Sequence, residues 1–410
     1  MSKNAMDVKP ETRELFLRMV GDFAVDRKGV YPDCSNELED LLYLAQIHSL
    51  GPVIYHMLQG QRKQLMEQKP ELFQHMQRAY HSAVYVSVTQ EASRAEIEEA
   101  FEKAGIKIVF FKGAQLRELY PVPELRTMGD MDCLIRREDR AKAHQLMIQL
   151  GYECQVDAEP VWMYNRNGIV IEMHTRVAAD SLGNGVDYPT MFSDAMMHVH
   201  EENGYLCLEW EYHFCYLIYH IAKHLSSTGA GVRMIADIAA FMYRRANQME
   251  WERVKSVLQE FQLWKTTLAV FGLCHQWFSV EIPTDDDIVS EQTLNDLEAY
   301  IIAGGTFGFE THDAGDIYRK KALRGGADTT GWKYRMRLTK SYLFPPKRYL
   351  VQYFSPTEKH SWLLPVAWFC RCWRGLVHRK RHSVATIQAM TQGDASRSYR
   401  EVCMLREIGL

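Results

Sequence analysis

One segment of the chain, residues 106–135, limits the possible fold more than any other. It begins with IKIVFF, a short and almost wholly apolar run that predicts a strand buried on both faces. A Lys-Gly pair then opens a helical stretch, and a second apolar strand begins with Asp130 and Asp132. Residues two apart in a strand project to the same face of the sheet. The segment therefore predicts a strand–helix–strand unit that presents two carboxylates on one rigid face.

A third carboxylate, Glu172, lies in the apolar run GIVIEMH, the second strand of a predicted hairpin that turns at residues 165–168. An unpaired carboxylate is costly to bury in such a strand, and a metal ion or a cation such as Arg176 would remove that cost. Carboxylates on one face suit a divalent ion that carries a nucleoside triphosphate. We expect Asp130, Asp132 and Glu172 to be the catalytic residues and the ligands of Mg2+ or Mn2+. A solvated turn before the strand is the alternative for the two aspartates.

The Lys-Gly pair, Lys112 and Gly113, lies where the first strand gives way to the helix. Glycine allows a phosphate to approach the backbone closely, and the N–H groups of a helix N-terminus favour an anion. Both residues are therefore candidates for nucleotide binding. A surface lysine is the alternative for Lys112.

The order of these motifs resembles the nucleotidyltransferase superfamily, which has the polymerase-beta-like fold. It is most similar to a bacterial branch of uncharacterised nucleotidyltransferase-like proteins, in which Lys-Gly replaces the usual Gly-Ser turn. Three features carry the resemblance: the Lys-Gly turn, the Arg-x-Met-x-Asp-x-Asp motif from Arg126 to Asp132, and the IEMH segment with Glu172. The resemblance is close over residues 105–176. It implies a metal-dependent transfer of a nucleoside monophosphate from a nucleoside triphosphate to an acceptor.

The resemblance also implies an α+β fold, with a small mixed β-sheet as the nucleotidyltransferase core between N-terminal and C-terminal helical regions. We expect an N-terminal helical region over 1–104, the α/β core over 105–200, a helical lobe over 201–285 and a C-terminal extension over 286–410. Within the extension, residues 306–330 are rich in Gly, Asp and Thr and have weak periodicity. They predict a loop or an ordered linker.

Two residues beside the acids are further candidates for nucleotide binding. Arg126 can present its guanidinium fork to a phosphate oxygen. A salt bridge to Glu118 or Glu124 is the alternative. His174 is predicted on the same strand face as Glu172, where it can orient that carboxylate, contact the substrate or serve a structural role.

A predicted helix near residue 220 carries His220 and His224, which are four residues apart and share a face. They can line a nucleotide cleft from the helical lobe or belong to a structural network, and we include both among the nucleotide-binding candidates. In the next helix Arg233 and Asp237 have the same spacing and can pair on the helix surface.

The composition limits compartment and partners. A net charge of -4 gives no global case for nucleic-acid binding. The nine cysteines are scattered without a CxxC pair, which favours free thiols in a reducing cytosol over a zinc site. The polar N-terminus is unlike a signal peptide, and no apolar run is long enough to span a membrane. We expect a cytoplasmic protein without a transmembrane segment.

The expected partners are a nucleoside triphosphate and an acceptor whose class is open: a small molecule, a glycan, a protein or RNA. Residues 361–382 mix tryptophans with arginines, so peripheral membrane contact through the C-terminal region is possible. Buried docking of that segment with a solvated basic end is the alternative. Two other functions compete with transfer: a catalytically inactive nucleotide-binding or regulatory module, and a toxin-like enzyme that modifies RNA or protein.

Overall fold

The chain forms two compact units in a computed structural model: Met1–Phe307 with Ile408–Leu410, and Gly308–Glu407. The structure describes residues 4–178, 182, 184–227, 229–306, 308, 310, 314–324, 332–345, 347, 350, 354, 356–377 and 395–410. The expected boundaries at residues 104, 200 and 285 stay a prediction.

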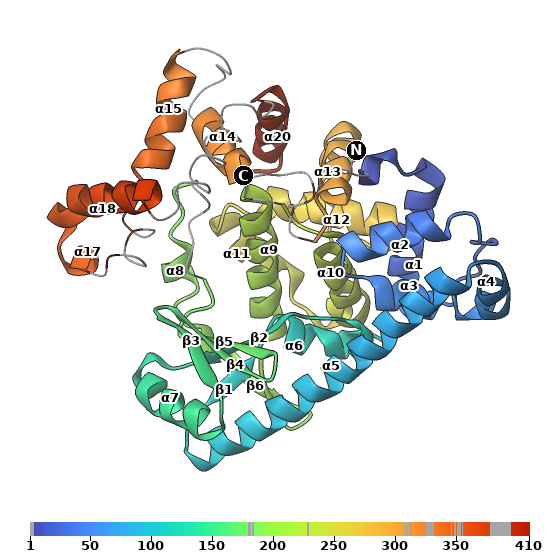
Figure 1. The fold of residues 1–410 in the computed structure, drawn as a ribbon, viewed down its shortest axis with the longest axis horizontal. Helices are drawn as coiled ribbons and strands as arrows, with labels where there is room; N and C mark the ends of the chain where they lie inside the picture. Colours follow the sequence, from blue (N-terminus) through green and yellow to red (C-terminus); the bar gives the residue numbers. More distant parts are fainter. Residues whose placement is uncertain are drawn as a thin grey trace. The chain divides into compact units, whose positions relative to one another are not determined.

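The first unit is built around a five-stranded sheet of order β1-β2-β5-β4-β3 (Figure 1). The strands are β1 (Ile108–Phe110), β2 (Asp130–Ile135), β3 (Glu153–Ala158), β4 (Val161–Arg166) and β5 (Ile169–His174). β2 and β5 are parallel, and the other neighbouring strands are antiparallel. The expected small mixed sheet with helical flanks, an α+β fold, is confirmed.

Strand alternation gives this sheet one face of buried hydrophobic residues. Met131, Cys133 and Ile135 of β2 pack in one cluster with Ile171 and Met173 of β5. Two helices contribute to the same cluster, the long α5 (Pro70–Lys103) and α7 (Arg140–Gln149). Because the apolar residues of β2 and β5 occupy this face, the polar residues at alternate positions project to the opposite face.

Helices from both ends of the first unit pack together. The N-terminal helices are α1 (Pro10–Ala24), α2 (Leu38–Ile47), α3 (Gly51–Met57) and α4 (Arg62–Gln68). The helices after the sheet are α9 (Trp210–Ser226), α10 (Val232–Arg245), α11 (Trp251–Glu260), α12 (Trp264–Phe278) and α13 (Glu291–Gly304). α1 packs directly on α10 and α12, so segments more than 200 residues apart share one core. A short helix α8 (Tyr188–Met191) and a hairpin of β6 (Val199–Glu202) and β7 (Tyr205–Leu208) lie between sheet and lobe in the chain.

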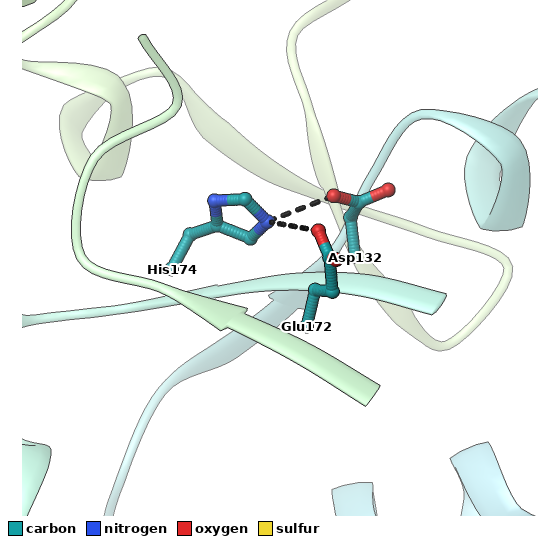
Figure 2. Close-up of side chains that lie close together, drawn as sticks. All are labelled: Asp132, Glu172 and His174. Carbon is teal, nitrogen blue, oxygen red and sulfur yellow. Dashed lines mark hydrogen bonds and ion pairs between the residues drawn. The ribbon is translucent and has the colours of Figure 1, made fainter. Parts of the chain in front are cut away.

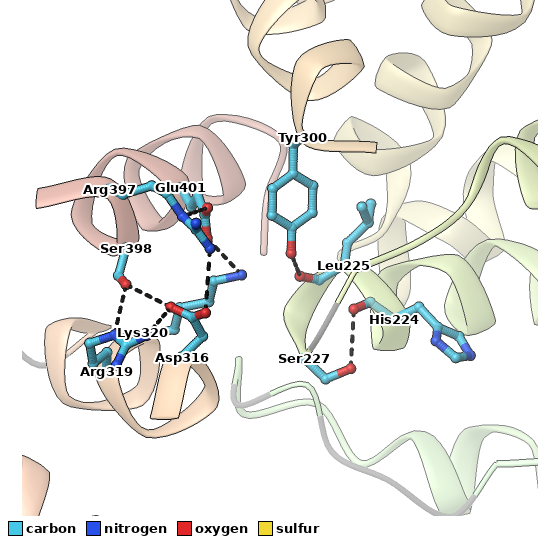
Figure 3. A network of polar contacts seen from close by, with 10 residues as sticks. All are labelled: His224, Leu225, Ser227, Tyr300, Asp316, Arg319, Lys320, Arg397, Ser398 and Glu401. Atoms are coloured by element: carbon cyan, nitrogen blue, oxygen red, sulfur yellow. Dashed lines mark hydrogen bonds and ion pairs between the residues drawn. The ribbon is translucent and has the colours of Figure 1, made fainter. Parts of the chain in front are cut away.

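The second unit is helical in its described part. Its helices are α14 (Ala314–Arg324), α15 (Trp332–Leu343), α17 (Pro356–Lys359), α18 (Leu364–Val377) and α20 (Ala395–Glu407). The prediction of a loop or linker over 306–330 is wrong at α14. Figure 3 shows contacts that the local sequence does not reveal: the buried Asp316, Arg319 and Lys320 of this helix have polar partners on α20. Lys320 pairs with Glu401 at 2.8 Å, and Ser398 donates to Asp316 at 3.2 Å. None of the helices in the described ranges has the length and apolarity needed to cross a bilayer.

Candidate active site

The parallel pairing of β2 with β5 brings the predicted acids together. Asp132 lies directly opposite Glu172 in the register of the two strands, and Leu134 lies opposite His174. The side chains of Asp132, Glu172 and His174 converge on the sheet face away from the apolar cluster (Figure 2). One potential ligand atom from each lies within 4.8 Å of the other two. The strand register thus joins residues 40 positions apart into one polar group.

Asp132 is the buried centre of this group. Its Oδ1 accepts hydrogen bonds from the Lys112 Nζ at 2.5 Å and lies 2.8 Å from the His174 Nε2. The same His174 nitrogen lies 3.7 Å from the Glu172 Oε2, so the His174 ring lies between the two carboxylates. Burial alone would raise the pKa of Asp132, but Lys112 and His174 outweigh it and hold the pKa well below its usual range. Asp132 is therefore ionised at neutral pH.

Asp130 occupies a different environment at the start of β2. It is the one exposed residue of the strand, and it lies outside the compact group of Asp132, Glu172 and His174. Desolvation by the surrounding protein raises its pKa, and the negative charges of Asp132 and Glu172 raise it further. Two of the three predicted metal-binding carboxylates, Asp132 and Glu172, thus lie close together, and His174 supplies a third potential ligand atom beside them. Asp130 adds a solvent-facing carboxylate at the edge.

Lys112 is held in a backbone conformation that lysine rarely adopts. Its φ of 51° and ψ of -124° belong to a region that favours glycine. Its backbone N–H donates to the buried His213 Nε2 at 3.1 Å, and its side chain reaches Asp132. The following helix, α6 (Gly113–Leu116), has only four residues. Such strain persists only where surrounding contacts impose it, and here these contacts aim the ammonium group at the acids.

Helix α9 provides the residues that face the acids from the lobe. His213, Tyr216 and His220 follow one another at helical spacing, and the ring of Tyr216 lies 5.5 Å from that of Phe111, next to Lys112. Burial lowers the pKa of His213 to about 3, so its Nε2 is free to accept from the Lys112 backbone. Burial also lowers the pKa of His220, and Lys112 lowers it further.

The sequence indicated two residues of α9 as nucleotide-binding candidates, His220 and His224. His224 lies one turn beyond His220, with the two rings 4.6 Å apart. His213 and Tyr216 were not predicted. The signal was present in the sequence, because positions 213, 216, 220 and 224 follow the helical period, but an apolar helix offers many such stripes.

Arg126 does not direct its guanidinium fork at the acids. Its Nη2 and Nε contact the two carboxylate oxygens of Asp237 at 2.6 and 3.0 Å, with both side chains buried. Tyr120 donates to the same carboxylate at 2.8 Å. Arg126 therefore pairs with Asp237 and not with Glu118 or Glu124, the partners considered from the sequence. Likewise, the principal cation beside Asp237 is Arg126 and not Arg233. The reason is tertiary: α10 lies against the segment before β2, 111 residues away in the chain.

This buried Arg126 also explains Gly113. A Cβ on Gly113 would lie 2.5 Å from the Arg126 Nη1 and 3.2 Å from the Met128 sulfur. A neighbouring buried side chain is therefore one physical reason for glycine at this position.

The loop between Arg126 and Asp130 is held from several directions. The Arg233 Nη1 donates to the Thr127 carbonyl at 2.9 Å, and the buried Gln90 of α5 donates to the Met128 carbonyl at 3.1 Å. The Thr127 hydroxyl donates to the Ser49 carbonyl at 3.2 Å. Contacts from the turn between α2 and α3, from α5 and from α10 therefore converge on the few residues that lead into the acids and fix where β2 begins.

The sequence matches a known family over most of the first unit. A family model described as an uncharacterised nucleotidyltransferase covers residues 35–279, a range that includes all of the candidate site residues. Among solved structures, the solution structure of the antibiotic-resistance factor ANT(2'')-Ia is similar at 14% sequence identity, with a TM-score of 0.33, over 46% of this chain and 98% of that chain. No curated protein matches the sequence.

Proposed function

The chain belongs to this family of uncharacterised nucleotidyltransferases, and we propose that it moves a nucleoside monophosphate from a nucleoside triphosphate to an acceptor, with release of pyrophosphate. The observation that carries the proposal is the register of β2 and β5, which sets Asp132 opposite Glu172 with His174 beside both. Carboxylate oxygens are the ligands that Mg2+ and Mn2+ prefer.

The donor set fits such an ion. Asp132 is held ionised, Glu172 is within ligand distance of it, and Asp130 adds an accessible carboxylate at the edge. We propose that these three residues hold Mg2+ or Mn2+ and that His174 fixes the orientation of Asp132. The ion would neutralise the triphosphate and increase the acidity of an acceptor hydroxyl.

The remaining roles belong to side chains of the site. In this proposal the Glu172 carboxylate accepts the proton of the acceptor hydroxyl as that oxygen attacks the α-phosphorus. The bond from that phosphorus to the bridging oxygen breaks, and pyrophosphate leaves. The Lys112 ammonium, which contacts Asp132 here, can turn to a phosphate oxygen when the carboxylate gains another cation. His220 and His224 remain candidates for contact with the nucleotide from α9. We assign the protein to the cytoplasm, a compartment that keeps its nine free cysteines reduced.

The test is a binding titration of the four ribonucleoside triphosphates, with and without Mg2+, while pyrophosphate release is followed in parallel. It compares the wild type with Asp130→Ala/Asp132→Ala. A matched control, Glu138→Ala/Asp139→Ala, removes the same charge just beyond the far end of β2. Metal-dependent binding that is lost only in the first variant supports the site. If no triphosphate binds the wild type, the proposal is wrong.

A second function is favoured by one observation. The ion pair of Lys112 with Asp132 supplies a protein cation where the proposed metal ligand lies. A chain that keeps this pair would bind a nucleotide without transferring it, as a regulatory module. It would show nucleotide affinity, no pyrophosphate release with any acceptor class, and little effect of Mg2+ on the affinity.

A further inference from the structure

A stripe of exposed apolar side chains runs along α18 and the turn before it, η8 (Ser361–Leu363), in the second unit. The stripe consists of Trp362, Val366, Phe369 and Trp373. Their exposed fractions are 74%, 46%, 68% and 60%. Spacings of four, three and four residues place them on one face of a helix. Large apolar residues on one helical face are ordinarily buried, so a continuous exposed stripe indicates a binding surface.

The other face of α18 is firmly packed within its own unit. The Trp368 Nε1 donates to the Pro345 carbonyl at 3.0 Å, and its ring meets Phe344 edge-on at 5.2 Å. The Arg371 guanidinium donates to the Tyr342 carbonyl at 2.9 Å and lies over the Tyr342 ring. The exposure of the stripe is therefore not that of a detached helix. One face is anchored to the end of α15, and the opposite face is presented outward.

The amino-acid composition of the segment that holds the stripe indicates which kind of partner the stripe would bind. Residues 359–393 contain no Asp or Glu. They contain six basic residues: Lys359, Arg371, Arg374, Arg379, Lys380 and Arg381. The exposed Arg374 lies beside the stripe, in a shallow recess that it lines with Phe369, Cys370 and Trp373. Aromatic side chains on one face with basic residues beside them are typical of helices that lie in the interface of an anionic membrane.

We propose that α18 docks the protein on the surface of a bilayer that contains anionic lipid. The Trp and Phe rings of the stripe would enter the boundary between head groups and acyl chains, and Arg374 would meet lipid phosphates. The helix has 14 residues, fewer than the roughly 20 needed to span the hydrocarbon core, so it lies in the plane of the interface. The proposal does not depend on nucleotide transfer.

The test is flotation of the full chain with vesicles of phosphatidylcholine containing about 30 mol % phosphatidylglycerol, and with vesicles of phosphatidylcholine alone. We expect binding to the anionic vesicles, a blue shift of tryptophan emission, and affinity at least about tenfold lower at high salt. Trp362→Ser/Trp373→Ser should bind at least about tenfold more weakly. Arg374→Glu tests the electrostatic part separately and should weaken binding only to the anionic vesicles.

The second unit offers a matched control for the stripe. Trp332 and Met336 of α15 are exposed by 67% and 60% but lie outside the stripe, so Trp332→Ser/Met336→Ser should bind vesicles like the wild type. Circular dichroism and thermal unfolding confirm that each variant is folded. The proposal is overturned if the wild type fails to bind anionic vesicles, if both double variants bind equally, or if binding ignores lipid charge. It is also overturned if no vesicles bind and light scattering shows that the wild type is a dimer whereas Trp362→Ser/Trp373→Ser is a monomer. The stripe is then an interface between two copies of the chain. Neither the vesicle assay nor light scattering uses nucleotide, so failure of the membrane proposal is distinct from failure of the proposed nucleotide transfer.

Discussion

Replacing Arg126 by alanine should destabilise the protein far more than the same replacement at Arg137. Both arginines contact a carboxylate through two nitrogens, Arg126 with Asp237 at 2.6 and 3.0 Å and Arg137 with Glu159 at 2.9 and 3.1 Å. The geometry is nearly the same, but the environments differ. The first pair is 9% and 7% exposed, whereas the second is 64% and 40% exposed.

The expected magnitudes follow from burial. Removing one partner of a buried ion pair costs about 3–5 kcal/mol, because the remaining charge stays desolvated. Tyr120 keeps its hydrogen bond to Asp237 in Arg126→Ala, so we expect the lower end, about 3 kcal/mol. An exposed pair contributes about 0–1 kcal/mol, so Arg137→Ala should change the free energy of unfolding by less than about 1 kcal/mol.

Urea unfolding of the full chain, followed by far-UV circular dichroism and tryptophan fluorescence, measures both free energies. A third variant, Arg126→Met/Asp237→Asn, removes both charges and keeps an amide oxygen that can accept from Tyr120. It should be more stable than Arg126→Ala, because no buried charge is left without a partner. The reasoning is refuted if Arg126→Ala costs no more than Arg137→Ala, or if the double variant is the least stable of the three.

Three other perturbations have definite expected outcomes. Gly113→Ala should destabilise the wild type, because the new Cβ would meet the Arg126 guanidinium. The same change should be nearly neutral when Arg126 is already alanine. A double-mutant cycle of urea unfolding measures this coupling, and additive effects would contradict it. Burial lowers the pKa of His48, which contacts the Ile302 carbonyl, to about 4. The unfolded chain therefore binds a proton on His48 more readily than the folded chain does. About 3 kcal/mol of stability should be lost as the pH falls from 6.5 towards 4. The loss should be smaller in His48→Gln. If the free energy of unfolding falls by the same amount in both proteins between pH 7 and 4.5, His48 does not have this role. Asp132→Asn should keep the fold but bind Mn2+ at least about tenfold more weakly in a titration followed by electron paramagnetic resonance, and unchanged affinity would remove it from the metal site.

The sequence by itself was enough to predict the strands that carry the candidate acids. Alternation in β5 separates Glu172 and His174 from Ile171 and Met173, and the structure keeps that separation. The buried run around β1 also became a strand. These predictions succeed because strand periodicity and apolar burial are local properties of a few consecutive residues.

Only the tertiary structure decided how the acids are surrounded. The parallel register sets Asp132 opposite Glu172, and α9 contributes His213 to hold the strained backbone of Lys112. The partner of Arg126 lies on α10, and no spacing rule connects residues 111 positions apart.

The helix α14 illustrates the same limit in the second unit. Its polar residues are typical of a loop when the local sequence is considered alone. In the structure they are buried and have partners on α20, among them Glu401 for Lys320. Local pattern determines which face of an element is apolar. Which distant side chain satisfies a buried charge depends on how helices pack, because that choice is set by the desolvation cost of the whole assembled core.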